Sequence, residues 1–380
     1  MPVKHETQMN IPLYEYSLWT ALPLMIFFGA YFLLARTPDK AIFDNYLRSR
    51  RIMGCALLLL SANYAVHLFT EIRLRDIDAA ILMNLSTYFL CYWLFSSALT
   101  TLLDRFYVTR RRMATHLAQW LLFTLAAGII LKWLPEGTTQ KIGLFVMAAW
   151  LVCYGLTLAR RLIKAYRRAV RLFDDTLSDD IAAYIRWLSI FTYWAVIFGV
   201  GCGLLTFLPD RYIFLWVFSS IPFYVYLFCS YMNYLLFYEQ VERALEADTL
   251  TEPAAADDTP EPAAAMPTSI RADIAARLEE WIAADKYTRP GLTITDVAND
   301  LLTNRTYLSG YINTTYDTTF REWITRLRIE YAKRLLLGSP ELTVQDVSER
   351  SGFQSTSHFI RIFKERTACP PAKWRKSVSE

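Results

Sequence analysis

Residues that build catalytic and metal centres are scarce in this 380-residue sequence, which has only four histidines and six cysteines. No two cysteines are spaced as CxxC, so neither a zinc site nor a disulfide framework is indicated. A Walker loop, GxSxG, HExxH and the protein-kinase motifs are also missing. We therefore expect a protein that is not an enzyme and that uses no cofactor and no metal.

Charged side chains are missing from several long runs between Tyr16 and Phe237, and apolar residues make up 54% of the whole sequence. About 20 apolar residues are needed to cross roughly 30 Å of hydrocarbon, and helices of soluble cores seldom carry such runs repeatedly. We predict seven transmembrane helices, at Leu18–Ala35, Ile52–Thr70, Ala79–Leu102, Met113–Leu134, Ile142–Ala159, Leu188–Leu208 and Tyr212–Phe237.

Ionisable side chains inside these spans are few, and His67, His116 and Lys132 are the notable ones. None is predicted at mid-depth, which argues against a pump or an ion-coupled transporter, and His67 is interpreted as a hydrogen-bonded packing residue. The aromatic runs Tyr88–Phe95 and Phe214–Tyr231 have two interpretations. They pack helices and mark the membrane interfaces, or they line a pocket for a lipid or another hydrophobic ligand.

Lysine and arginine are abundant in the first, third and fifth loops between these spans and sparse in the alternate loops. Positive charge marks the cytoplasmic side of a bacterial inner membrane. Seven spans then place the N-terminus outside and the C-terminal domain in the cytoplasm. The first 15 residues lack a signal-peptide cleavage site, so we expect the first span to be kept and no large external domain to precede it.

The fifth loop, Arg160–Ile185, has a basic amphipathic first half followed by acidic residues, namely Asp174, Asp175, Asp179 and Asp180. Its two interpretations are a helical extension at an anionic membrane surface and a docking surface for the C-terminal domain. After the last span, Tyr238, Val241 and Leu245 predict a short helix, which could form a two-helix contact. The segment Asp248–Thr268 is rich in Ala, Pro and acids and predicts a flexible linker.

A short motif occurs twice in the C-terminal part, as LTITDVA at Leu292–Ala298 and as LTVQDVS at Leu342–Ser348, 50 residues later. A repeat of this kind indicates one supersecondary unit used twice. Each copy predicts a helix, a tight turn and a second helix, with Thr295 and Thr343 as capping residues. The turns fall at Leu302–Asn304 and Gly352–Gln354, where Gly352 can supply a positive φ and the second turn is one residue longer.

The second helices are predicted at about Asn304–Asn313 and Ser355–Arg366, with Leu308, Ile312, Phe359 and Phe363 as apolar anchors. A connecting helix has an apolar stripe and basic residues on its other faces. The stripe is Phe320, Trp323, Ile324, Leu327, Tyr331 and Leu335, and the basic residues are Arg321, Arg326, Arg328, Lys333 and Arg334. Two such copies could place their second helices in successive major grooves, about 34 Å apart.

The run from Gly352 to Lys376, GFQSTSHFIRIFKERTACPPAKWRK, resembles the C-terminal signature of the AraC/XylS family of transcription regulators. The matching positions are Gly352, Phe353, Ser357, Phe359, Arg361, Phe363, Lys364, Pro371 and Arg375, while Ala368 replaces a glycine. Arg326–Leu337 is similar to the linker helix of that family. The first copy departs more from the family pattern, with Gly310 and Asn313 at places that are often basic and Asp317 in place of a glycine. The resemblance covers about 110 residues and implies a double helix-turn-helix that binds DNA.

Side chains on the exposed N-terminal halves of the second helices can reach base edges, because hydroxyl, amide and guanidinium groups match the donors and acceptors of the major groove. These candidates are Asn304, Arg305, Thr306 and Ser309 in the first copy and Gln354, Ser355, Thr356, His358 and Arg361 in the second. Basic residues nearby are expected to contact phosphates and to fix the register. They are Lys364, Arg366, Lys373 and Arg375.

Together these features predict an all-α protein, a seven-helix transmembrane bundle followed by a soluble double helix-turn-helix domain. The expected domains are residues 1–237, a short helix and linker at 238–268, and the DNA-binding domain at 269–380. We expect a membrane-anchored transcription regulator whose partners are promoter DNA and RNA polymerase, with a homodimer and a hydrophobic or lipid ligand of the membrane domain as further partners. The alternative is a membrane receptor or scaffold whose helix-turn-helix domain binds a protein.

Overall fold

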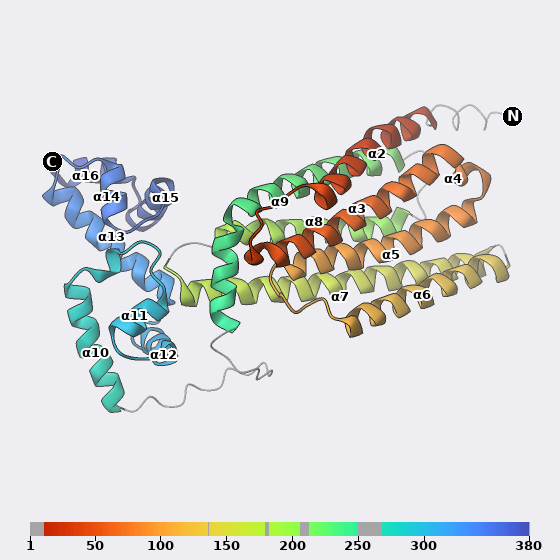
Figure 1. Ribbon diagram of the computed structural model, residues 1–380. Coiled ribbons are helices and arrows are strands. Elements are labelled where there is room, and N and C mark those ends of the chain that lie inside the picture. Colours follow the sequence, from red (N-terminus) through yellow and green to blue (C-terminus); the bar gives the residue numbers. More distant parts are fainter. Residues whose placement is uncertain (1–10, 136, 179–181, 206–212, 250–267, 380) are drawn as a thin grey trace. The chain divides into compact units, whose positions relative to one another are not determined.

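The computed structural model describes residues 11–135, 137–178, 182–205, 213–249 and 268–379, and within these ranges it consists of helices joined by turns (Figure 1). The chain divides into two compact units, each assembled from two stretches of sequence. We call Met1–Arg168 with Ile185–Glu242 the apolar unit, and Ala169–Tyr184 with Arg243–Glu380 the helix-turn-helix unit. The predicted all-α class is confirmed for the described residues.

Long helices build the described part of the apolar unit; α7 and α9 continue past its boundary, and α8 begins three residues before it. They are α2 (Ile11–Leu34), α3 (Asp44–Thr70), α5 (Ile77–Thr101), α6 (Arg110–Trp133), α7 (Thr138–Thr176), α8 (Ala182–Leu205) and α9 (Ile213–Thr249), with short turns of helix at η1 (Ala41–Phe43) and α4 (Ile72–Arg75). Side chains define some of the starts: the Asp76 carboxylate accepts the Ala79 N–H, and the Thr109 hydroxyl accepts the Arg112 N–H.

Five helices of the described chain are long and apolar enough to cross a membrane. They coincide with the first five predicted spans and lie at Leu13–Leu34, Ala41–Thr70, Ile77–Thr101, Arg110–Trp133 and Thr138–Thr176. Helices α8 and α9 cover the described parts of the sixth and seventh predicted spans, and α8 includes a shorter apolar stretch at Ile185–Phe198. The count of seven transmembrane helices stays a prediction.

Two glycines allow α2 and α3 to pack closely. A Cβ atom on Gly54 would lie 3.0 Å from the carbonyl oxygen of Gly29, and one on Gly29 would lie 2.9 Å from the Leu58 side chain. Small residues at such crossings let two helix backbones approach, which is the common packing device between membrane helices. The contact therefore brings the first two predicted spans together.

A cluster of polar side chains inside the apolar unit is joined by hydrogen bonds between α3 and α5. The Asn63 amide donates to Asn84 at 3.1 Å and to Thr87 at 3.3 Å, and His67 Nε2 lies 2.8 Å from the same Asn84 oxygen. A buried polar group without a partner is costly, so such clusters tie neighbouring helices together. The interpretation of His67 as a packing residue agrees with this network.

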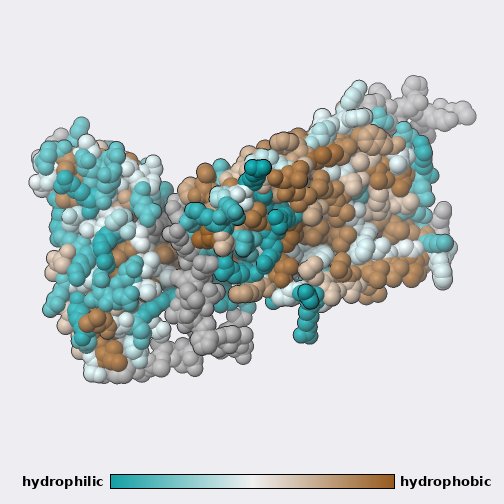
Figure 2. Space-filling model, viewed as in Figure 1, coloured by the Kyte–Doolittle hydropathy of each residue, from teal (hydrophilic) through white to brown (hydrophobic). Residues whose placement is uncertain are grey.

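The outer surface of α6 is strongly apolar. Large hydrophobic side chains on this helix are exposed, and they recur at helical spacing: Met113, Leu117, Leu121, Leu122, Leu125, Ile129 and Trp133. On the face shown in Figure 2, apolar residues cover most of the long helices, whereas polar residues dominate the surface of the helix-turn-helix unit. An exposed apolar face of this length is suited to lipid rather than water.

Among its described residues, the helix-turn-helix unit contains seven complete α-helices besides its stretches of α7, α8 and α9. They are α10 (Thr268–Ala283), α11 (Ile294–Asp300), α12 (Arg305–Tyr316), α13 (Phe320–Gly338), α14 (Val344–Arg350), α15 (Thr356–Thr367) and α16 (Pro371–Ser379), with a short turn of helix, η3, at Lys286–Thr288. Helix α13 runs from the α11–α12 pair to the α14–α16 group (Figure 1). It is the predicted connecting helix.

Two separate cores lie along α13. Phe320, Trp323 and Ile324 pack with α10, α11 and α12, whereas Ile329, Ala332 and Leu336 pack with α14 and α15. Arg328 stands between the two sets and is 1% exposed. The prediction that Arg328 lies on a basic outer face is therefore wrong. It is four residues after Ile324 and four before Ala332, so helical periodicity places it in the buried stripe.

Several predicted features fall wholly or partly outside the described residues. These are the N-terminal tail at 1–10, Asp179 and Asp180, the connection between the sixth and seventh predicted spans, and most of the linker, 250–267. The short helix predicted after the last span is the end of α9 itself. Tyr238 and Val241 are fully buried in the apolar unit, so these two side chains pack within the chain.

Candidate nucleic-acid interface

Both copies of the repeat begin with the same capping arrangement. The Thr293 hydroxyl accepts the Asp296 N–H at 3.2 Å while the Asp296 carboxylate accepts the Thr293 N–H at 2.9 Å, and Thr343 with Asp346 repeats this at 3.1 and 2.9 Å. Such reciprocal bonds satisfy two donors that the first turn of a helix leaves unpaired. The predicted cap at Thr343 is confirmed, but Thr295 lies inside α11, so Thr293 is the cap of the first copy.

The turns of the two copies begin with the same backbone geometry. Leu302 and Gly352, 50 residues apart, have φ angles of 51° and 82°. In each copy the next residue, Thr303 or Phe353, donates its N–H to the carbonyl of Ala298 or Ser348. Residues 301–304 separate the first pair of helices and residues 351–355 the second, so the extra residue predicted for the second turn is present.

The predicted anchors hold both second helices against their cores. Leu308, Ile312, Phe359 and Phe363 are all fully buried. Side chains on the opposite faces of α12 and α15 are thereby turned outward, because residues three or four apart share a face of a helix. These two helices occupy the place of recognition helices in a double helix-turn-helix.

Arg328 joins the first copy to the second. Its Nε donates to the Tyr287 carbonyl at 3.0 Å, and one terminal nitrogen donates to the Arg289 carbonyl at 2.7 Å. The guanidinium carbon lies 5.9 Å from the centre of the Phe353 ring, next to the second turn. A buried arginine with several hydrogen bonds favours one arrangement of the chain around it, so Arg328 ties the second turn to the backbone before α11.

The predicted base-contacting residues of the first copy lie around the start of α12. Asn304 is exposed but is also the capping residue, and its side-chain oxygen accepts the Tyr307 N–H at 2.8 Å. Thr306 is exposed, whereas Arg305 and Ser309 are half-buried. Thr306 therefore offers the most open side chain of this set, while the amide nitrogen of Asn304 is free of the capping bond.

The predicted residues of the second copy lie around the start of α15. Ser355 caps the helix by accepting the His358 N–H at 3.4 Å, and Gln354 and Arg361 are exposed. Thr356 and His358 are half-buried. Arg361 pairs with Glu365 on the same helix at 3.1 Å, an exposed pair that holds weakly and can yield to a nucleic-acid base or phosphate.

The four predicted phosphate contacts differ in their surroundings. Lys364, Arg366 and Lys373 are exposed, and Arg366 forms an ion pair with Glu322. Arg375 donates to the Pro340 carbonyl at 3.0 Å and to the Leu342 carbonyl at 2.8 Å. These bonds close the α13–α14 turn, so Arg375 has a structural role in addition to its predicted contact with DNA.

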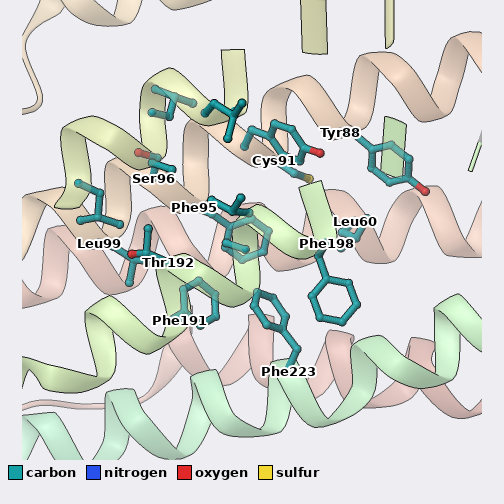
Figure 3. A pocket seen from close by; sticks show the side chains of 18 of the residues that line it. Leu60, Tyr88, Cys91, Phe95, Ser96, Leu99, Phe191, Thr192, Phe198 and Phe223 are labelled. Carbon is teal, nitrogen blue, oxygen red and sulfur yellow. The ribbon is translucent and has the colours of Figure 1, made fainter. Parts of the chain in front are cut away.

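A second candidate site is a cavity in the apolar unit, shown in Figure 3. Helices α3, α5, α7, α8 and α9 surround about 930 Å³ of empty space, including the part open to its surroundings. Phe191 stacks on Phe223 with ring centres 4.4 Å apart, and Phe198 lies 5.0 Å from the same ring. Hydroxyl groups of Ser96 and Thr192 also line the cavity. A largely apolar cavity with a few polar groups suits a hydrophobic ligand.

Comparison with known proteins supports the assignment of the C-terminal segment. Residues 297–377 match a family described as a helix-turn-helix domain. A 59-residue segment is 44% identical to the transcriptional activator NphR of Rhodococcus sp, and covers 16% of this chain and 17% of that protein. An 85-residue segment is 32% identical to the melibiose operon regulatory protein of Escherichia coli K12, and covers 22% of this chain and 28% of that protein.

A solved structure, the C-terminal domain of the two-component response regulator yesN from Fusobacterium nucleatum, is 29% identical over 27% of this chain and 97% of that one, with a TM-score of 0.24. The chain thus spans less than a third of the length of the curated relatives named above. The C-terminal segment is a helix-turn-helix domain of the AraC/XylS type, as its signature predicts.

Proposed function

We propose that this chain is a membrane-anchored transcription regulator that binds promoter DNA sequence-specifically through both helix-turn-helix copies. The observation that carries the proposal is the pair of copies with matching caps and turns, held together by the buried Arg328. A rigid pair presents two helices to two grooves of one duplex, which a single flexible copy does not do.

The apolar helices support the membrane anchor. Five helices in the described part of the chain have the length and composition of spans, and α6 exposes an apolar stripe. In this proposal the bundle lies in the bacterial inner membrane, with the N-terminus outside and the helix-turn-helix unit in the cytoplasm. RNA polymerase is the partner through which bound protein would change transcription, and a homodimer would double the DNA contacts.

The membrane domain is proposed as the sensor, and the cavity of Figure 3 as the place where a lipid or another hydrophobic ligand binds. The cavity touches five helices, so an occupant can change their packing. A ligand shifts a conformational equilibrium only by its difference in affinity for the two states. Occupancy must therefore favour one arrangement of these helices over another.

The test is selection of duplexes from a random pool by the full-length protein in lipid nanodiscs, followed by chromatin immunoprecipitation from cells. We expect enrichment of one sequence motif and a few promoter peaks. Changing Arg361 and Lys364 to alanine should remove the peaks, since the first faces bases and the second phosphates. The matched control changes Arg326 and Lys333 of α13 to alanine, which removes the same charge outside α12 and α15.

The competing function is a receptor or scaffold whose helix-turn-helix unit binds a protein. The departures of the first copy, Gly310 and Asn313, favour it, because they leave α12 poor in positive charge. Selection that enriches no sequence, together with promoter peaks that are unchanged in the Arg361 and Lys364 variant, would support this alternative and contradict the proposal.

A further inference from the structure

The helix-turn-helix unit includes a stretch of chain that lies far from it in sequence. Ala169–Ser178, the end of α7 and the two residues after it, belongs to this unit by its contacts. Four of its side chains are buried: Ala169, Phe173, Thr176 and Ser178. This segment, which we call the α7 end, precedes the matched family region at 297–377 by more than a hundred residues. It is therefore an addition to the helix-turn-helix domain.

Backbone and side-chain bonds hold the α7 end against the first copy. The Ser178 N–H donates to the Leu292 carbonyl at 3.0 Å, and Leu177 forms an antiparallel bridge with Thr293, the capping residue of α11. Arg328 donates to the Ser178 hydroxyl at 3.3 Å. The α7 end thus reaches the same arginine that joins the two copies.

One acidic residue of the α7 end forms an ion pair with α13, and the acidic residue after it is influenced by a positive charge of the first copy. Asp174 pairs with Arg321 at 2.8 Å, with both side chains only about a quarter exposed. Burial and the neighbouring Asp174 raise the pKa of the Asp175 carboxyl group, and the positive charge of Arg305, the first residue of α12, opposes this rise. Arg305 is also a predicted DNA contact, so a duplex held by the start of α12 would bring its phosphates toward the negative charge of these carboxylates.

We propose that the α7 end is an intramolecular latch that binds the first helix-turn-helix copy and opposes its binding to DNA through Asp174 and Asp175. The proposal rests on the DNA-binding function proposed above. Carboxylates and phosphates carry charge of the same sign, and their repulsion extends over about 8 Å at physiological salt. DNA binding at the first copy is then favoured by release of the latch.

The latch also gives the sensor a route to the DNA-binding residues. Helix α7 contributes Val152, Gly155 and Leu162 to the lining of the cavity in Figure 3, and the same helix continues to Thr176. The proposal extends to the sensor: an occupant of the cavity that binds one arrangement of α7 more tightly than another would change the fraction of protein with the latch released.

The first experiment measures the affinity of the full-length protein in nanodiscs for a selected duplex. We expect the Asp174→Asn, Asp175→Asn variant to bind about tenfold more tightly than wild type, within the 5-fold to 150-fold range typical of coupling between sites. The control, Glu330→Gln with Glu341→Gln, removes two exposed acids of the same unit and should change affinity by less than about twofold. Equal affinities for the latch variant and wild type would overturn the proposal.

The second experiment locks the latch. Residues 177 and 293 form a bridge pair, and paired residues of adjacent extended chains lie within the Cα separation that a disulfide spans. The Leu177→Cys, Thr293→Cys variant should form this disulfide on oxidation, as mapped by mass spectrometry, and bind DNA about tenfold more weakly than the same protein after reduction. Comparing one protein in two redox states cancels the loss of the Thr293 cap.

The outcomes separate the latch from the proposed function. The control variant Leu177→Cys, Ser377→Cys measures how much disulfide forms between residues that are not paired. If the 177–293 disulfide forms no more than the disulfide of this control, the docking itself is overturned. Equal DNA affinity before and after reduction overturns the opposition to DNA. The DNA-binding function fails if no duplex is enriched by wild type, by the Asp174 and Asp175 variant or by the reduced cysteine variant. The role of the latch in DNA binding then fails too. Formation of the 177–293 disulfide would still show that the α7 end docks on the first copy.

Discussion

Gly352 turns the chain between α14 and α15 with a φ of 82°. A Cβ atom there would lie 2.3 Å from the Thr288 carbonyl oxygen. The backbone of the loop before α11 therefore needs the space that glycine leaves, and this contact brings the second turn to the first copy. Both the left-handed conformation and the contact exclude larger residues.

Gly352→Ala should destabilise the helix-turn-helix unit by at least about 2 kcal/mol, since a left-handed alanine and a backbone overlap both cost free energy. The measurement uses the full-length protein and finds the urea concentration at which half of it is cleaved by a protease within residues 268–379. The matched control is Gly338→Ala, where nothing lies within 4 Å of the added Cβ and φ is not positive. Equal losses in both variants would contradict the role of Gly352.

Ala368 ends α15 in the left-handed conformation, with a φ of 63°. The AraC/XylS signature has a glycine here, and Asp317, which also replaces a glycine, ends α12 with a φ of 49°. Glycine is the usual residue at this position after a helix, because it adopts a positive φ without steric cost. Both α12 and α15 therefore end on a non-glycine residue with a positive φ, which costs more for Ala368 than for Asp317.

Ala368→Gly should stabilise the unit by about 1 kcal/mol, because relief of the left-handed alanine exceeds the entropy cost of glycine. The control is Ala276→Gly in the exposed interior of α10, which should cost about 0.5–1 kcal/mol. Both changes in stability are measured by urea unfolding, with protease sensitivity as the signal. If Ala368→Gly instead lowers the stability, contacts of the Ala368 methyl group, rather than its positive φ, decide which residue is preferred at this position.

The capping boxes of α11 and α14 act at the scale of the element. The hydroxyl and N–H of Thr343 both donate to the Asp346 carboxylate and hold its pKa below the ordinary value. Because the pKa is lower in the folded than in the unfolded state, the carboxylate contributes stability that is present above about pH 4. This contribution is lost as the pH falls through the folded pKa.

Asp346→Asn should therefore flatten the acid side of the stability profile. Between pH 7 and pH 3 the wild-type helix-turn-helix unit should lose more stability than the variant, as followed by denaturant unfolding at each pH. Thr343→Ala removes a donor to the same carboxylate and should flatten the profile in the same direction. Identical profiles for wild type and both variants would show that the capping box does not contribute to acid sensitivity.

The number of transmembrane spans is a property of the whole molecule. Both five and seven spans place the two chain ends on opposite sides, because both numbers are odd. They differ between α8 and α9: with seven spans that connection is outside, and with five it is cytoplasmic. Basic loops predict which side is cytoplasmic.

Fusions of alkaline phosphatase and of green fluorescent protein at residue 209 should distinguish these cases. We expect an active phosphatase and a dark fluorescent protein there, as expected for an external loop of a seven-span bundle. At residue 380 we expect the reverse, and fusions at residue 107, in the basic third loop, serve as a cytoplasmic control. Fluorescence at 209 would favour five spans, and phosphatase activity at 380 would contradict the proposed orientation.

Local patterns account for most of the correct predictions. Runs without charge located the long helices, and the 50-residue repeat located both helix-turn-helix copies with their turns and anchors. The same repeat aligns Thr293, not Thr295, with Thr343, so the correct first cap could have been found from the sequence. The burial of Arg328 was also indicated by helical spacing, but its charge favoured an outer face.

The sequence by itself determined the all-helical class, the apolar runs and the duplicated helix-turn-helix, because spacing, capping and apolar periodicity act over a few neighbouring residues. Only the tertiary structure decided that Arg328 binds the Tyr287 and Arg289 carbonyls, that five helices enclose a cavity, and that the α7 end contacts Thr293. These features depend on residues tens to more than a hundred positions apart. Their contact is set by the packing of whole helices, which no local pattern encodes.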